Sequence, residues 1–125
     1  MSTLIPRLVL LAALAFAAFP TSPQTAPVAA QRTPQFENED VKVWKSVVPP
    51  NAPLAMHTHQ HPRVIIALTG GTMKVVYEDG TSEMHNWETG KAFWLPTSEG
   101  VKRHADVNTG SKPIEVMVVE VKNAK

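Results

Sequence analysis

Short apolar runs, each ended by proline or glycine, constrain the fold of this chain more than any other feature of its sequence. From residue 36 onward no segment keeps a helical apolar period for longer than a turn or two. The run VKVWKSVV at 41–48 stops at two prolines, which cannot donate to a sheet ladder. The run IEVMVVEV at 114–121 alternates between two faces. Roughly seven or eight such strands predict an all-β domain, either a sandwich or a barrel.

The segment TMKVVYEDGTSEMHNW at 72–87 predicts a β-hairpin. Asp79 and Gly80 both tolerate positive φ, so they are expected to form a tight type I′ turn. Another strand is expected over 54–61, where Pro62 permits only an edge, a bulge or a bend before the next apolar run.

Residues 1–30 have the three-part layout of a secretory signal peptide. Arg7 provides the charge, LVLLAALAFAAF at 8–19 the apolar region, and Ala30 a small residue at the cleavage site. Cleavage after Ala17 is the alternative. The apolar run is shorter than the roughly 20 residues that a membrane-spanning helix needs, so an uncleaved anchor is the less favoured interpretation.

The mature protein is therefore expected to be secreted or periplasmic, and not bound to a membrane once the signal peptide has been removed. Residues 31–35 are expected to form a flexible leader, because they continue a stretch rich in proline and small polar residues. Residues 36–125 are expected to form the single folded domain.

Charge and cysteine content exclude several classes of protein. The formal net charge is +1, it falls to zero without residues 1–30, and charges of both signs are scattered, so no nucleic-acid partner is expected. Without cysteine the domain forms neither disulfides nor thiolate metal sites. A domain of about 90 residues buries only about 60–65% of its chain surface. A bound metal or a dimer interface would therefore help to stabilise it.

Three of the five histidines alternate in the segment HTHQHP, as His57, His59 and His61. On a strand, such residues point to the same face, roughly 7 Å apart between successive α-carbons. Two neighbouring imidazoles can converge on one divalent metal ion, while a third ligand normally comes from another strand. The alternative is a row of surface histidines on an edge strand.

The segment 51–70 resembles the first cupin motif, G(X)5HXH(X)3-4E(X)6G. Asn51 stands where the leading glycine belongs, and His57 and His59 stand at the two histidines. Arg63 stands at the glutamate, and Gly70 ends the motif with the family spacing.

A later segment, 90–108, resembles the second cupin motif, G(X)5PXG(X)2H(X)3N. Gly90 and Pro96 match its opening, and His104 and Asn108 match its close. Ser98 replaces the motif's glycine, and three extra residues lengthen the loop before the histidine. The two motifs together cover most of the expected domain.

This resemblance implies a cupin-type double-sheet β-barrel, jelly-roll-like in topology, with one divalent ion near its middle. The implied ligands are His57, His59 and His104, and the implied cofactor is a divalent transition metal: iron, manganese, nickel, copper or zinc. By the same resemblance the chain is expected to form a homodimer. If it is an enzyme, the expected class is a dioxygenase or related metal-dependent oxidoreductase acting on a small anionic organic substrate. The alternative is a non-enzymatic barrel that binds or senses a small anion.

Arg63 departs most from the family pattern, because a guanidinium has no lone pair and cannot bind a metal. At about 5 Å from a divalent ion it would be repelled by roughly 7 kcal/mol at an effective dielectric of 20. Three interpretations stay open. In the first, Arg63 turns away from a three-histidine site and binds an anionic substrate; in the second, His61 supplies a fourth nitrogen; in the third, the arginine replaces the metal and binds a small anion directly.

Overall fold

The computed structural model describes residues 26 and 28–124. In this part of the chain eight strands and one short 3-10 turn follow one another, and no helix is long and apolar enough to cross a bilayer. The strands are β1 (Gln31–Glu37), β2 (Val41–Val48), β3 (Arg63–Thr69), β4 (Gly71–Tyr77), β5 (Ser82–Trp87), β6 (Ala92–Leu95), β7 (His104–Asn108) and β8 (Ile114–Val121), and the turn is η1 (Thr97–Glu99).

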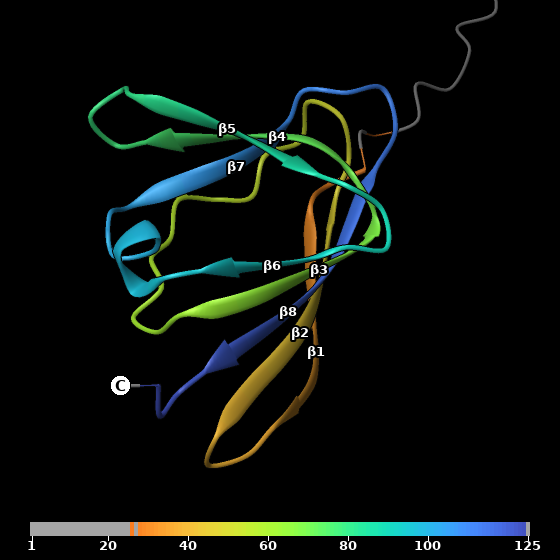
Figure 1. Cartoon of the computed structure of the whole chain (residues 1–125). Coiled ribbons are helices and arrows are strands. Elements are labelled where there is room, and N and C mark those ends of the chain that lie inside the picture. Colours follow the sequence, from red (N-terminus) through yellow and green to blue (C-terminus); the bar gives the residue numbers. More distant parts are fainter. Residues whose placement is uncertain (1–25, 27, 125) are drawn as a thin grey trace, which may run out of the picture.

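The strands form two antiparallel sheets that face each other (Figure 1). One sheet has the order β1-β2-β8-β3-β6, and the other has the order β5-β4-β7. Non-consecutive neighbours such as β2 and β8 show that the chain crosses between sheets rather than meandering within one. The predicted all-β, double-sheet architecture is confirmed.

The core lies between the sheets and follows the predicted alternation of β8. Ile114, Val116 and Val118 point inward and are each at most 6% exposed. The inward face of β2 adds three more buried side chains: Trp44, Ser46 and Val48. Met73 and Trp87 close the core from the opposite sheet.

Residues 31–35, expected to be a flexible leader, lie in β1, which pairs with β2 along its length. Every residue of β1 is exposed, so the strand carries no apolar alternation that could have predicted it. Backbone pairing holds it in place, and the register shifts between Pro34 and Phe36, as expected where proline cannot donate to a ladder. The signal-peptide prediction lies outside the described residues, apart from positions 26 and 28–30.

The strand predicted over 54–61 is wrong as a regular element. The segment runs beside β7 in an extended form, because the Leu54 amide donates to the Asp106 carbonyl at 3.0 Å. His57 and His104 exchange backbone hydrogen bonds of 2.8 and 3.0 Å as an isolated antiparallel bridge. The chain then bends at residues 60–61, just before Pro62, which ends the alternation of the three histidines.

The predicted hairpin is confirmed as β4 and β5, but its turn is not type I′. The Tyr77 amide donates to the Thr81 carbonyl, so the loop holds three residues rather than two. Gly80 has φ of +85°, whereas Asp79 is not among the positive-φ residues of the described chain. The Asp79 carboxylate instead accepts hydrogen bonds from the amide and hydroxyl of Thr81, which favours this longer loop.

Asn51 stands where the first cupin motif has its leading glycine. It has φ of 55° and is the only non-glycine residue with positive φ in the described part of the chain. Asparagine is among the side chains that tolerate this left-handed region best. The backbone conformation that a glycine would adopt is therefore kept without one.

Asn108 ties the two sheets together. The side chain has no exposed surface, and its Nδ2 donates to the carbonyls of Val48 in β2 at 2.9 Å and of Lys112 at 2.6 Å. Its Oδ1 accepts from the Gly110 amide at 2.8 Å. Both donor positions of this buried amide, and one of the two acceptor positions of its oxygen, are thus used at the end of β7.

We expect Asn108→Ala to lower the free energy of unfolding by about 2–4 kcal/mol, because it leaves buried carbonyls and an amide without partners. Urea unfolding of the metal-free protein measures the change. Asn86→Ala, at an exposed position of β5, is the control and should stay within about 0.5 kcal/mol of the wild type. Equal losses in the two variants would contradict the structural role of Asn108.

Candidate metal centre

His57, His59 and His104 come together at one point between the sheets. One ligand atom from each lies within 4.8 Å of the other two. The first two belong to the extended segment between β2 and β3, and His104 is the first residue of β7. His59 and His104 are buried, while His57 is half-buried. The juxtaposition predicted for two histidines from one segment and one from a distant strand is present.

Backbone carbonyls fix the orientation of two of these rings. Nδ1 of His57 donates to the Ala55 carbonyl at 2.7 Å, and Nδ1 of His104 donates to the Lys102 carbonyl at 2.7 Å. Each proton is therefore on Nδ1, and each lone pair is on Nε2. This is the usual arrangement of metal-binding histidines, whose second nitrogen bonds to an acceptor in the protein.

Burial favours the neutral form of two of the imidazoles, those of His57 and His59. It is the largest cause that lowers the pKa of His59 to about 2, and the Arg63 charge is the second. Burial also lowers the pKa of His57, further assisted by the charge of Arg32. Neutral imidazoles have free lone pairs, which a metal requires. In donor type and proximity, the three residues fit a divalent transition metal.

His61 does not join this cluster. Because the chain bends at residues 60–61, His61 lines a groove on the outside of the site, where Thr58 and Gln60 also lie. The three-histidine grouping of the described residues does not include it. The parity argument from the sequence assumed a straight strand through position 61, and the bend before Pro62 removes that condition.

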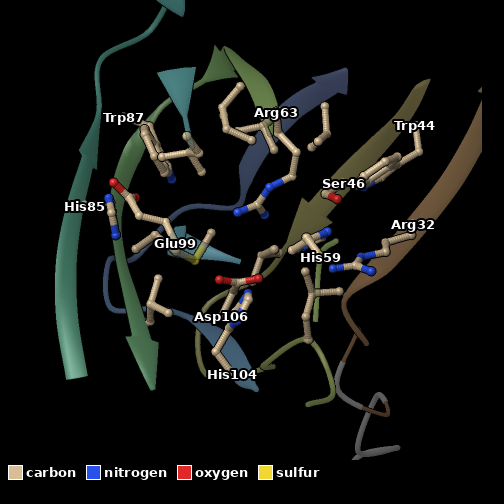
Figure 2. Close-up of a pocket in the computed structure, with 18 of the residues that line it drawn as sticks. Arg32, Trp44, Ser46, His59, Arg63, His85, Trp87, Glu99, His104 and Asp106 are labelled. Carbon is tan, nitrogen blue, oxygen red and sulfur yellow. The ribbon is translucent and has the colours of Figure 1, made fainter. Parts of the chain in front are cut away.

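Arg63 points into the cavity between the sheets (Figure 2). The residue is only 5% exposed, and its Nε has no hydrogen-bond partner. Burial lowers its pKa, against which the charges of Asp106 and Glu120 act most strongly. A buried guanidinium with an unused donor is ready to bind an anion.

Gly100 lets the loop after η1 approach the site closely. A Cβ at this position would lie 2.7 Å from Cβ of His59 and 3.2 Å from a terminal guanidinium nitrogen of Arg63. The Gly100 carbonyl accepts a hydrogen bond of 2.8 Å from the His59 amide. Gly100 therefore allows a close approach of the loop to His59 and Arg63 that a side chain at this position would block.

Arg32 belongs to the site but was not predicted, because it lies in the segment interpreted as a leader. It extends from β1, and its Nη2 donates to Nε2 of His57 at 2.6 Å. Its guanidinium lies 5.7 Å from the ring centre of Trp44, within the range of a cation–π contact. Arg32 thus occupies the lone pair that a metal would use on His57.

Two carboxylates beside the histidines were also missed. Oδ2 of Asp106 lies 3.5 Å from Nε2 of His57, and Oε2 of Glu120 lies 3.7 Å from Nδ1 of His59. The sequence did contain a signal for Asp106, because it follows His104 by two residues and so shares its face of β7.

No protein-family model and no curated protein matches this chain. A crystal structure of a cupin domain from Bordetella pertussis Tohama I is similar, with a TM-score of 0.66 at 26% identity over 79% of this chain and 99% of that one. An RmlC-like cupin family protein with a double-stranded beta-helix fold, from Methanocaldococcus jannaschii, gives a TM-score of 0.57 at 20% identity over 78% and 84% of the two chains. A conserved protein with a double-stranded beta-helix domain, from Klebsiella pneumoniae, gives 0.57 at 19% identity over 82% and 85%.

The chain belongs to the cupin superfamily. Within this cupin, His57, His59 and His104 lie together as the two motifs implied, while the motif glutamate is replaced by a buried arginine.

We expect Arg32→Ala to strengthen Zn²⁺ binding by roughly 3- to 10-fold, because it removes a donor worth about one hydrogen bond from the lone pair of His57. Isothermal titration of the metal-free cupin measures the affinity. Arg103→Ala, which removes an exposed arginine paired with Glu78, is the matched control. An unchanged or weaker affinity in Arg32→Ala would show that the two do not compete.

Proposed function

We propose that this protein is a metal-binding cupin whose cavity takes a small organic anion, with Arg63 as the anchor for the anion. The observation that carries the proposal is the cluster of three histidines, two of which line the cavity, beside a buried, incompletely bonded guanidinium that lines the same cavity. The first feature suits a divalent cation, and the second suits an acidic ligand.

The charges around the site support metal binding despite the arginine. Arg32 and Arg63 contribute two positive charges, and three carboxylates act on Arg63, from Glu99, Asp106 and Glu120. With neutral histidines, this set is net negative by one charge before a metal binds and net positive by one after a divalent ion is added. Without a metal, these five side chains therefore attract a cation. Once a divalent ion is bound, the site attracts an anion.

The walls of the cavity define the kind of ligand. Apolar side chains from both sheets line it, among them Ile65, Met73 and Trp87. Arg63 would hold a carboxylate or enolate in a two-pronged grip at the polar end. A bound transition metal would supply open coordination positions for substrate and dioxygen. We therefore propose a dioxygenase or related metal-dependent oxidoreductase as the class of enzyme, with iron, manganese, nickel or copper as the metal. Zinc would suit the histidines as ligands, but it has no redox chemistry and would not support this reaction.

Metal analysis tests the proposed function directly. We expect purified protein to bind close to one divalent metal ion per chain after growth with metal supplements, and the His57→Ala, His104→Ala double variant to bind none. Elemental analysis by mass spectrometry measures the content. A His85→Ala variant, which removes a histidine outside the cluster, should keep the metal. Metal that persists in the double variant would contradict the site.

A second function is favoured by the contact between Arg32 and His57. Because this contact uses a metal-binding lone pair, the cavity could serve as a non-enzymatic barrel that binds or senses an anion on two arginines. Wild-type protein that contains no metal under any supplement, yet binds an anion, would support this function over the first.

The two functions share a requirement for Arg63. We expect benzoate and inorganic phosphate to raise the melting temperature of the wild type, and Arg63→Gln to lose that increase because the buried charge is gone. Thermal denaturation with and without each anion measures the shift. Arg103→Gln controls for the loss of an arginine on the surface. An equal shift in Arg63→Gln would show that anions bind elsewhere.

We also propose, from the sequence, that the protein is exported to the periplasm or secreted, and that it acts as a homodimer. The position of β1 at the edge of the five-stranded sheet is compatible with sheet extension across a partner copy. Sequencing of the mature N-terminus and light scattering in solution test these two proposals.

A further inference from the structure

The three-histidine cluster lacks the carboxylate that the family pattern provides, because Arg63 stands at that position. A neutral set of three imidazoles leaves both charges of a divalent ion uncompensated by its ligands. The site therefore raises the question of which other side chain could supply a negatively charged ligand atom.

Asp106 has the required position. It lies in β7 two residues after His104, and Figure 2 shows both side chains rising from this strand into the cavity. Its Oδ2 is 3.5 Å from Nε2 of His57. Two atoms that bind one ion at about 2.0–2.1 Å are themselves roughly 3.0–3.4 Å apart. The distance between Asp106 and His57 is therefore close to that of two atoms on one ion. The grouping of three histidines does not include Asp106, so its carboxylate would have to move toward His59 and His104 when an ion binds.

The other two nearby carboxylates are placed differently. Glu120 lies beside Nδ1 of His59, and it lines the outer groove rather than the cavity. Glu99 reaches the cavity from η1, on the side of the loop. Only Asp106 combines a place on the wall of the cavity with an oxygen next to the nitrogen of His57 that has the lone pair.

Arg63 provides an independent sign that a ligand belongs here. The residue is only 5% exposed, lines the same cavity, and has an Nε without a hydrogen-bond partner. Figure 2 shows its guanidinium and the Asp106 carboxylate directed toward the same space. Asp106 is also the largest attractive charge on Arg63.

We propose that Asp106 is the fourth metal ligand, so that the site is a centre of three histidines and one aspartate. This inference rests on the proposed metal-binding function and adds a ligand that neither motif contains. The carboxylate has in effect moved from the start of β3 to β7, and the arginine occupies the position it left. The ion with its aspartate keeps one positive charge, and Arg63 is free to face the organic anion.

Binding of Co²⁺ alone tests the assignment, because the visible spectrum of Co²⁺ reports its coordination. We expect Asp106→Asn to weaken Co²⁺ binding by about tenfold or more, which is the lower end of what loss of even an outer-shell partner costs. The spectrum of the bound ion should change as well. Asp106→Glu, which keeps a carboxylate, should recover part of the affinity.

Glu120→Gln is the matched control, since it removes the same charge beside another histidine of the cluster. It should keep the wild-type spectrum. If Co²⁺ affinity fell equally in Asp106→Asn and Glu120→Gln and both spectra were unchanged, Asp106 would act only through its charge and not as a ligand. That result would overturn the proposal. Circular dichroism of the metal-free variants verifies that each is folded. Wild-type protein that binds no Co²⁺ would instead overturn the proposed function, and this inference with it.

Discussion

The antiparallel bridge between His57 and His104 is the contact on which the site depends. Their reciprocal backbone hydrogen bonds, 2.8 and 3.0 Å long, fix the extended segment before β3 against the start of β7. Residues in such a directly opposed pair have neighbouring side chains on the same face. The ring centres of the two histidines are consequently 4.5 Å apart. His59 and Asp106 follow from this bridge, because each lies two residues along the chain from one of its members.

The charge of Arg63, buried beside this bridge, is the second constraint. Partial loss of solvent lowers the pKa of Arg63 and also that of Arg32, whose residue is exposed overall, and in both cases the charges of Asp106 and Glu120 oppose the effect. Buried charges persist only when opposite charges or ligands compensate them. The two arginines and the carboxylates are therefore one electrostatic unit, and replacing any one of them changes the balance for the rest. Because of this coupling, an arginine can occupy the position of the motif glutamate without making the cavity repel cations.

The sequence predicted the architecture and the histidine cluster well, because both rest on patterns with a clear geometric meaning. Alternation identified β2 and β8, and motif spacing identified His57, His59 and His104. The errors arose where tertiary pairing decides the structure. The residues of β1 are all exposed and are held by the backbone of β2, so the sequence around Arg32 gave no sign of a strand. The bend at residues 60–61, which removes His61 from the cluster, depends on how the chain enters β3 at Pro62.

The proposed role of Asp106 illustrates why motif spacing alone would describe a metal site incompletely. A motif records positions along the chain, whereas a metal responds to atoms gathered in space, and a barrel offers inward positions on several neighbouring strands. A carboxylate lost from one strand can be replaced from another that faces the same cavity, provided that parity and depth are right. In this chain Asp106 meets both conditions, since it shares the inward face of β7 with His104 and lies at the depth of His57. With arginine at position 63, the positive charge then lies where the motif has its carboxylate, and the carboxylate of Asp106 lies elsewhere in the same cavity. On this proposal the number of ligands is kept.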